Sequence, residues 1–367
     1  MAISAASWRP CEELELQLFH LRLHCISQRG AENELVHLEG AMDVGNGKGG
    51  YLLERCATEP DSVPAIRLPQ FAPVDIVAIV ILSRGNCGLS RCISRYLVSM
   101  AATDLLVIIT AVILNRIPAI YFPGSSLSIT PVCSLSITLI YAARVTSVWL
   151  TVMFTFDRYV AICWQKLKAK YCTHRTAGIV VSVVCTLGCV INIPWYFLHE
   201  PMYVIDNVPW YCKQKDDRYS FILWTLFDWT DRVLTPCLPF LLILSFNTLT
   251  VRHILAASRS RKRLRSCTTG EMQSDPEMES RRKSIILLFT ISGCFILLWM
   301  PSVVHFFVRR FQVGYTINGY SDPRFILMEV ANMLQMLSCC TNTFIYAVTQ
   351  NKFRKELKVL MNCMRNI

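Results

Sequence analysis

The 367-residue chain carries few charges for its length. Charged residues make up 17% of it and apolar residues 53%, with a mean hydropathy of +0.38, whereas a soluble domain has about a quarter charged residues. This balance excludes a soluble globular protein. It also excludes a disordered one, since disorder requires low hydrophobicity. The net charge of +11 then indicates basic cytoplasmic loops rather than a nucleic-acid partner.

Several chemical motifs are also missing from the sequence. We find no nucleophile–base arrangement, P-loop or metalloprotease motif, so no enzyme is predicted. No histidine or further cysteine completes a zinc set with Cys339 and Cys340 or with Cys87 and Cys92, so no metal site is expected. The first seventy residues hold no apolar core of signal-peptide length. Neither they nor the outside loops contain an Asn-x-Ser/Thr sequon.

Long apolar runs dominate the chain instead. A helix needs roughly 20 mostly apolar residues to cross a bilayer, and six segments meet or approach that length: Leu97–Leu114, Val132–Cys163, Thr176–Leu198, Val233–Val251, Ser284–Val308 and Phe325–Gln350. A seventh segment, Phe71–Leu82, includes Pro73 and Asp75. As a helix it would cover only about 18 Å, so it is short for a span.

The loop charges predict an orientation and a division of the chain. Ser83–Tyr96, Trp164–Arg175 and Arg252–Lys283 are basic, and the alternate loops are not. Because basic loops mark the cytoplasmic side, we expect a multi-pass plasma-membrane protein with a cytoplasmic C-terminus. Seven spans place the N-terminus outside, and six place it inside. We expect residues 1–70 to be a poorly ordered extension or a gene-model artefact, 71–350 a membrane domain, and 351–367 an amphipathic cytoplasmic helix and tail.

Polar residues within the spans are the functional candidates, because charge at membrane depth is costly. Asp157–Tyr159 reads Asp-Arg-Tyr and ends the second long span. Alone, this tripeptide is equally well explained as an interfacial pair. Asp104 lies midway along its span, Trp299–Pro301 forms a Trp-x-Pro kink, and Asn342–Tyr346 closes the last span.

In this order and at these depths, the motifs resemble those of the rhodopsin-like G-protein-coupled receptors, over roughly Phe71–Cys363. Phe156–Cys163 and Val330–Leu334 are most similar to the orphan "probable G-protein coupled receptor 139" type. The resemblance implies an all-α membrane protein, with a seven-transmembrane helix bundle, a truncated first helix and a short amphipathic helix after the last span. It implies a receptor that binds a small extracellular ligand and activates heterotrimeric G proteins. The closer resemblance implies an aromatic amino acid or short peptide as ligand, and the calcium-mobilising G-protein class.

The resemblance also assigns roles to residues. It implies a G-protein switch in which Asp157 holds Arg158 at rest, made of Asp157, Arg158, Tyr159, Asn342 and Tyr346. It implies an activation toggle at Phe295, Trp299 and Pro301. It implies a pocket for an allosteric sodium ion at Asp104, Ser147, Ser338 and Asn342. A protonated Asp104 without sodium is the alternative, and no other cofactor is expected. A disulfide between Cys133 and Cys212 is expected on the oxidising side.

Arg144 distinguishes this chain within the resembled family. It lies fourteen residues before Arg158, about 21 Å nearer the outside on the same helix face, where such receptors bind ligands. Two interpretations stay open. Arg144 is either a structural partner of Glu329 or binds a ligand carboxylate while an acid binds an amine. The candidate ligand-binding residues are Tyr141, Arg144, Asp231, Arg232, Trp299, His305, Phe306 and Glu329.

The C-terminal segment predicts contact with membrane lipid. Phe353, Leu357 and Leu360 recur at helical spacing among basic residues, a pattern typical of an amphipathic helix on a membrane. Cys363 follows them and is a candidate for palmitoylation.

Five positions depart from the family pattern, among them Asn247 in place of a tyrosine and Val184 in place of a tryptophan. Asp75 stands where the family usually has Asn, Thr343 where it has Pro, and Arg281 where some members place a glutamate that locks Arg158. Asp75 and the short first helix together predict a folding problem. A non-signalling truncated receptor therefore stays open as an alternative function. So does an ion-coupled transporter with a path along Asp104, Arg144 and Glu329.

Overall fold

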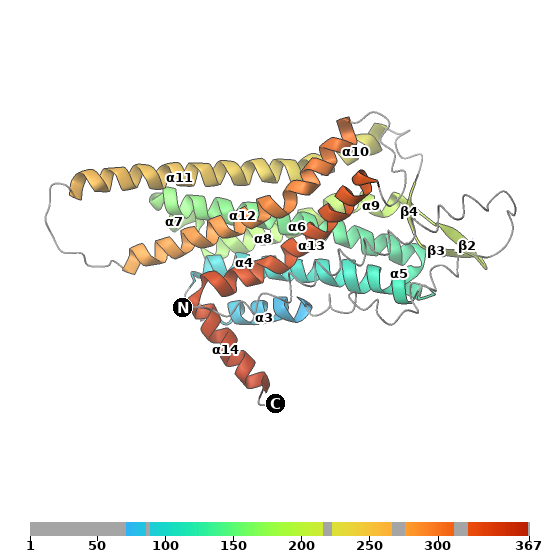
Figure 1. Cartoon of the computed structure of the whole chain (residues 1–367), viewed down its shortest axis with the longest axis horizontal. Coiled ribbons are helices and arrows are strands. Elements are labelled where there is room, and N and C mark those ends of the chain that lie inside the picture. Colours follow the sequence, from blue (N-terminus) through green and yellow to red (C-terminus); the bar gives the residue numbers. More distant parts are fainter. Residues whose placement is uncertain are drawn as a thin grey trace.

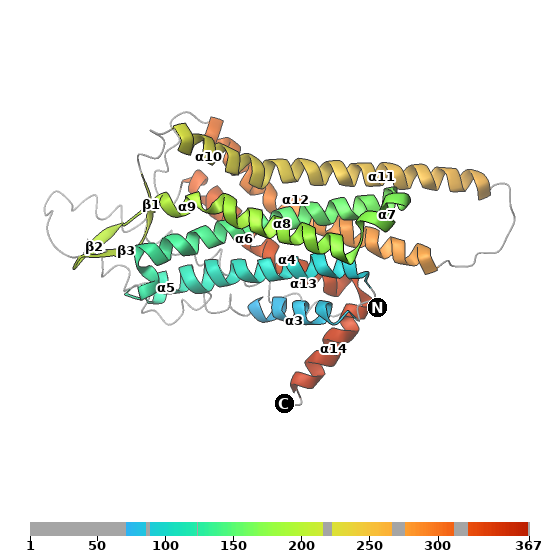
Figure 2. The ribbon, with the colours of Figure 1, turned by 180° about the vertical axis from the view of Figure 1, so that it is seen from behind.

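The computed structural model describes residues 71–85, 89–122, 124–215, 222–265, 276–311 and 322–365. The predicted extension over 1–70 lies outside these ranges. Within them, long helices lie side by side along one axis, with short strands at one end and α14 leaving the bundle at the other (Figure 1). Figure 2 shows the same two ends from behind. We call them the strand end and the α14 end.

Seven helical segments of the described residues form the bundle. They are α3 (Phe71–Ser83), α4 (Arg91–Ile108) with the π-helix η3 (Ile109–Arg116), α6 (Thr130–Cys163), α8 (His174–Asn192), α10 (Ile222–Arg232) with the π-helix η6 (Val233–Cys237) and α11 (Leu238–Arg265), α12 (Pro276–Phe311), and α13 (Pro323–Thr349). Both π-helices involve a proline, because Pro118 follows η3 and Pro236 lies within η6. A proline removes one helical hydrogen bond, and the wider turn accommodates that loss.

Short elements connect these segments. They are α5 (Ile117–Tyr121), the 3₁₀-helix η4 (Ser126–Ser128), α7 (Gln165–Tyr171), α9 (Pro194–Phe197), the antiparallel pair β1 (His199–Glu200) and β4 (Lys213–Gln214), and the hairpin of β2 (Tyr203–Ile205) and β3 (Val208–Trp210). The final helix, α14 (Asn351–Arg365), is the amphipathic helix expected after the last span. Its Phe353 is buried against Tyr346.

Five of the described helical segments are long and apolar enough to cross a membrane: Arg91–Arg116, Thr130–Cys163, His174–Phe197, Ile222–Ala257 and Ile285–Arg309. Helix α13 has 27 residues but carries several polar ones. Helix α3 has only 13 residues, about 20 Å, as the short first apolar run predicted. The predicted seven-helix bundle is therefore confirmed, and its first helix has 13 residues within the described part of the chain.

The buried core joins the short α3 to its neighbours. Ala78, Ile81 and Leu82 of α3 pack in one cluster with side chains of α4, α6, α12, α13 and α14. Close approach of α6 and α8 depends on Gly188, since a Cβ there would collide with the Thr146 hydroxyl. Small residues at such crossings allow membrane helices to pack closely. The truncated α3 thus forms part of the core despite its length.

The disulfide predicted between Cys133 and Cys212 is present, with a Cα–Cα distance of 6.0 Å. It ties the start of α6 to the strands. The Tyr211 amide donates to the Ser128 carbonyl at 2.7 Å, and the Thr130 hydroxyl donates to the Tyr211 carbonyl at 2.6 Å. Burial raises the pKa of the Tyr211 phenol. These contacts fix the strands over the strand end of the bundle.

Candidate functional site

The Asp157–Arg158 pair lies near the α14 end of α6 and is buried. Two of the three Arg158 side-chain nitrogens, Nε at 3.1 Å and Nη2, donate to Oδ2 of Asp157. The other carboxylate oxygen, Oδ1, accepts a hydrogen bond from the Cys92 thiol at the start of α4, with a 3.3 Å sulfur–oxygen distance. The carboxylate is thus held by its own helix on one oxygen and by α4 on the other. The arrangement is the Arg158-paired state that the resemblance implies at rest.

A second thiol meets Asp157 from the turn after α7. The Cys172 thiol donates to the backbone carbonyl of Asp157 at 3.5 Å. Burial, followed by the nearby Asp157 charge, raises the pKa of the Cys172 thiol to about 12. It therefore stays protonated as a donor and has little thiolate to oxidise. Sequence reasoning missed both Cys92 and Cys172, because nothing in a chain with 17 cysteines marks these two.

The other switch residues face different surroundings. The Tyr159 hydroxyl accepts from the Trp164 indole at 3.2 Å, and its ring stacks on Phe246. Tyr346 is fully buried, and its hydroxyl has no partner among the described residues. The predicted switch residues therefore do not all meet in this state.

A polar cluster lies in the middle of the bundle around Asp104, which is only 1% exposed. Its Oδ1 accepts from the Ser147 hydroxyl at 2.7 Å, and its Oδ2 accepts from the Asn342 amide at 2.8 Å. Ser338 lies in the same cavity as Ser147 and Asn342. Carboxylate and hydroxyl oxygens are ligands that hard cations prefer, so these residues fit a sodium ion in chemical type.

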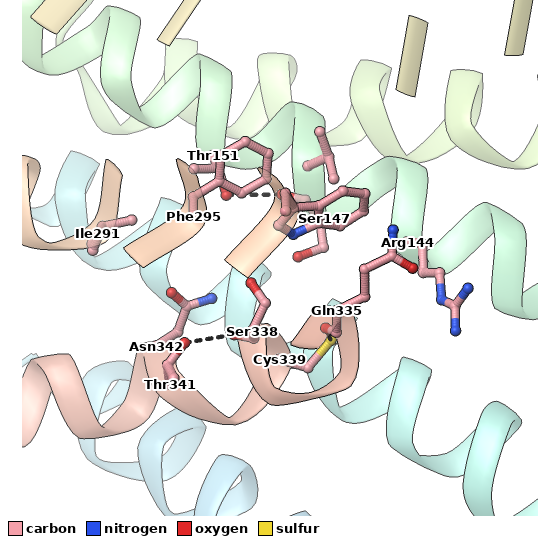
Figure 3. Close-up of a pocket in the computed structure, with 12 residues that line it drawn as sticks. Arg144, Ser147, Thr151, Ile291, Phe295, Gln335, Ser338, Cys339, Thr341 and Asn342 are labelled. Carbon is pink, nitrogen blue, oxygen red and sulfur yellow. Dashed lines mark hydrogen bonds between the residues drawn. The ribbon is translucent and has the colours of Figure 1, made fainter. Parts of the chain in front are cut away.

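The cavity itself runs from this cluster toward the strand end. Figure 3 shows Arg144 at one side and Asn342 at the other, with Gln335 and Ser338 between them. The lining residues come from α6, α12 and α13: Arg144, Ser147, Val148, Thr151, Ile291, Phe295, Trp299, Gln335, Ser338, Cys339, Thr341 and Asn342. The predicted toggle residues Phe295 and Trp299 stack with ring centroids 5.4 Å apart. Gln335 was missed, although its spacing of seven from Asn342 puts both on one helix face.

Arg144 is half-buried in this cavity. No carboxylate belongs to the lining residues, and no acid of the described part of the chain forms an ion pair with Arg144. Glu329 lies on α13, half-buried, and is not among the lining residues. The guanidinium is thus presented to the cavity together with neutral polar groups.

The remaining ligand candidates lie outside this cavity lining. Tyr141 stacks on Trp195 with ring centroids 4.4 Å apart, and Phe306 packs edge-on against Trp229 at 6.0 Å. Asp231 is buried and accepts from Thr235, and His305 is half-buried on α12. The side chains of Arg232 and Cys363 fall outside the described residues. The structure therefore brings Arg144 and Trp299 to one cavity, and the other candidates whose side chains it describes are not among the lining residues.

A helical membrane bundle with a polar centre and a buried Asp-Arg pair defines a seven-helix receptor. The family described as 7 transmembrane receptor (rhodopsin family) matches residues 75–346, and the chain belongs to this family. It is a family of receptors rather than enzymes, whose partners are G proteins and extracellular ligands. Among curated proteins, the FMRFamide receptor of Drosophila melanogaster is 26% identical over 296 residues, which cover 77% of this chain. The chain spans 50% of that relative's length.

Proposed function

We propose that the chain is a receptor that binds a small extracellular ligand, a short peptide or an aromatic amino acid, between Arg144 and Trp299. Binding at this level releases Arg158 from Asp157 and activates a heterotrimeric G protein of the calcium-mobilising class at the α14 end. The strand end then faces outward, and the α14 end with the C-terminus faces the cytoplasm. The similarity to a receptor named for the peptide FMRFamide supports a peptide-type ligand.

The observation that carries this proposal is that one helix, α6, contributes residues to the cavity, to the Asp104 cluster and to the Asp157–Arg158 pair. Arg144 lines the cavity, Ser147 holds Asp104, and Arg158 pairs with Asp157, all on α6. A ligand that displaces the Phe295–Trp299 stack moves α12 against α6, where Val148 and Val152 pack in one cluster with these two rings. Packed interfaces shift between discrete arrangements rather than deforming continuously. The release of Arg158 is such a two-state change.

Arg144, which no acid among the described residues pairs, indicates what the ligand carries. A guanidinium binds a carboxylate through two parallel hydrogen bonds, and such bonds are stronger than neutral ones. The cavity lining supplies no competing acid. An anionic ligand group, such as the carboxylate of an amino acid or of an unamidated peptide, therefore fits this position. Trp299 and Phe295 provide an apolar floor for an adjoining side chain.

The experiment that tests the function measures nucleotide exchange on purified G proteins of each class in membranes that contain the receptor. Wild type is expected to promote ligand-independent exchange on the calcium-mobilising class. Arg158→Ala is expected to abolish it, because the always-charged group that is released toward the partner is gone. Arg84→Ala, at an exposed cytoplasmic-loop arginine, is the matched control. Equal exchange in wild type and Arg158→Ala would refute the switch, and an ion flux that survives in Arg158→Ala would favour a transporter.

A further inference from the structure

Asp75 is a buried acid without a role in the proposed switch. It lies on α3 and is 1% exposed. Its Oδ1 accepts a hydrogen bond from the Thr343 hydroxyl at 2.8 Å, whereas its buried Oδ2 has no partner among the described residues. An ionised carboxylate with a bare oxygen inside a membrane bundle is costly. The charge state of Asp75 therefore needs an explanation.

Asp104 on α4 is a second buried acid, also 1% exposed, but its hydrogen bonding differs from that of Asp75. Both oxygens of Asp104 receive hydrogen bonds, from Ser147 and Asn342, whereas only one oxygen of Asp75 does. A buried carboxylate oxygen that accepts no hydrogen bond favours the protonated form of its acid. The proton then belongs on Asp75, at the bare Oδ2.

Thr343 and Asn342 are neighbours on α13, and each contacts one of these acids. Asn342 donates to Asp104 on α4, and Thr343 donates to Asp75 on α3. Successive residues of a helix point about 100° apart, so the two bonds hold α13 from two directions. A rotation of α13 that preserves one bond strains the other. The pair at Asp75 thus restricts how Asn342 can move relative to Asp104.

We propose that Asp75 is held as a neutral acid and acts with Thr343 as a positioning pair, which keeps Asn342 against Asp104 while Arg158 is paired with Asp157. A neutral Asp75 has the size and the carbonyl acceptor of an asparagine. The pair therefore relieves the folding problem that an ionised Asp75 would create. The proposal rests on the proposed function only for its signalling readout, and its structural part stands without it.

Infrared spectroscopy of the full-length receptor in lipid nanodiscs tests the proton directly. The difference between wild type and Asp75→Asn is expected to contain the C=O stretching band of a protonated carboxylic acid. Its absence, with a carboxylate band in its place, would overturn the neutral acid and favour a second cation ligand. Because Asn keeps the acceptor for Thr343, Asp75→Asn is also expected to melt within about 2 °C of wild type. A larger loss would likewise contradict the proposal.

A double-mutant cycle tests the pair. Asp75→Ala and Thr343→Val are each expected to lower the melting temperature by about 2–4 °C, and the double variant is expected to melt no lower than the worse single variant. Thr343→Ser keeps the hydroxyl and is expected to restore the wild-type value. Strictly additive losses would overturn the pair, whatever the receptor signals to.

The positioning role has its own readout. Thr343→Val is expected to raise ligand-independent nucleotide exchange about fivefold per receptor at the surface, the effect of about one neutral hydrogen bond, and Thr343→Ser is expected to reverse the rise. Unchanged exchange in Thr343→Val, with wild-type exchange still dependent on Arg158, would overturn the positioning role alone. If the wild-type receptor promotes no nucleotide exchange at all, that result would instead count against the proposed function.

Discussion

The Cys92 thiol is the part of the switch that permits the sharpest test. Cys92 is 2% exposed and donates to Oδ1 of Asp157, the carboxylate oxygen that Arg158 does not contact. Replacing Cys92 by Ala removes this donor without adding bulk. The Arg158-paired state then loses a contact between α4 and α6. We expect ligand-independent signalling to rise.

The magnitude follows from the kind of hydrogen bond. Hydrogen bonds to charged groups contribute about 1.5–3 kcal/mol, and neutral ones about 1 kcal/mol. A thiol is a weak donor. The hydrogen bond from Cys92 is therefore expected to contribute about 1 kcal/mol, as a neutral hydrogen bond does, although its acceptor is charged. About 1 kcal/mol changes an equilibrium roughly fivefold, since 1.4 kcal/mol is tenfold. Basal exchange in Cys92→Ala is therefore expected to be about five times that of wild type.

The assay is ligand-independent nucleotide exchange in membranes, divided by surface receptor number. Cys92→Ser retains a donor and is expected to stay near wild type. Cys172→Ala is the comparison variant, because the hydrogen bond that the Cys172 thiol donates goes to the Asp157 backbone carbonyl. If Cys92→Ala signals like wild type, or if Cys172→Ala rises equally, the thiol does not hold the switch through the Asp157 carboxylate and the reasoning is refuted.

Two further predictions concern the cavity and the α6–α8 contact. Arg144→Leu is expected to abolish the response to an activating ligand with a carboxylate, with Arg144→Lys retaining part of it because the charge remains. Calcium responses to phenylalanine and to the free-acid and amidated forms of one short peptide measure this, and an equal response of Arg144→Leu and wild type would exclude Arg144 from binding. Gly188→Ala is expected to destabilise the receptor by about 1–3 kcal/mol through its collision with Thr146. Thermal melting should show partial recovery in Gly188→Ala/Thr146→Ala and little change in Gly293→Ala, where a Cβ meets open space.

Features that repeat along a helix were predictable from the sequence. The apolar runs predicted the membrane-spanning helices, because crossing a bilayer requires a minimum length of apolar helix. The spacing of fourteen between Arg144 and Arg158 placed both on one helix face, and Arg144 lines the cavity inside the bundle. The Cys133–Cys212 bond followed from two cysteines on the oxidising side, and the structure contains it.

Contacts between distant helices were not predictable in the same way. Tyr141 and Phe306 were candidate ligand-binding residues, and in the structure Tyr141 stacks on Trp195 and Phe306 packs edge-on against Trp229. Aromatic side chains gain as much from packing on one another as from a ligand, and helix periodicity does not say which partner they find. The contact of Cys92 was equally hard to predict from the sequence, because its partner Asp157 lies 65 residues away.

The two unusual residues Asp75 and Thr343 show how such distant contacts change the interpretation of a sequence. Considered singly, an acid in the first helix is a defect, since a buried charge without a partner costs several kcal/mol, and a threonine in place of proline is a neutral variation. The structure joins them by a 2.8 Å hydrogen bond across 268 residues. The cost of one departure is offset by the other, so neither is understood alone. The truncated α3 is held in the same manner, because its Ala78, Ile81 and Leu82 pack into the core and Asp75 fastens it to α13.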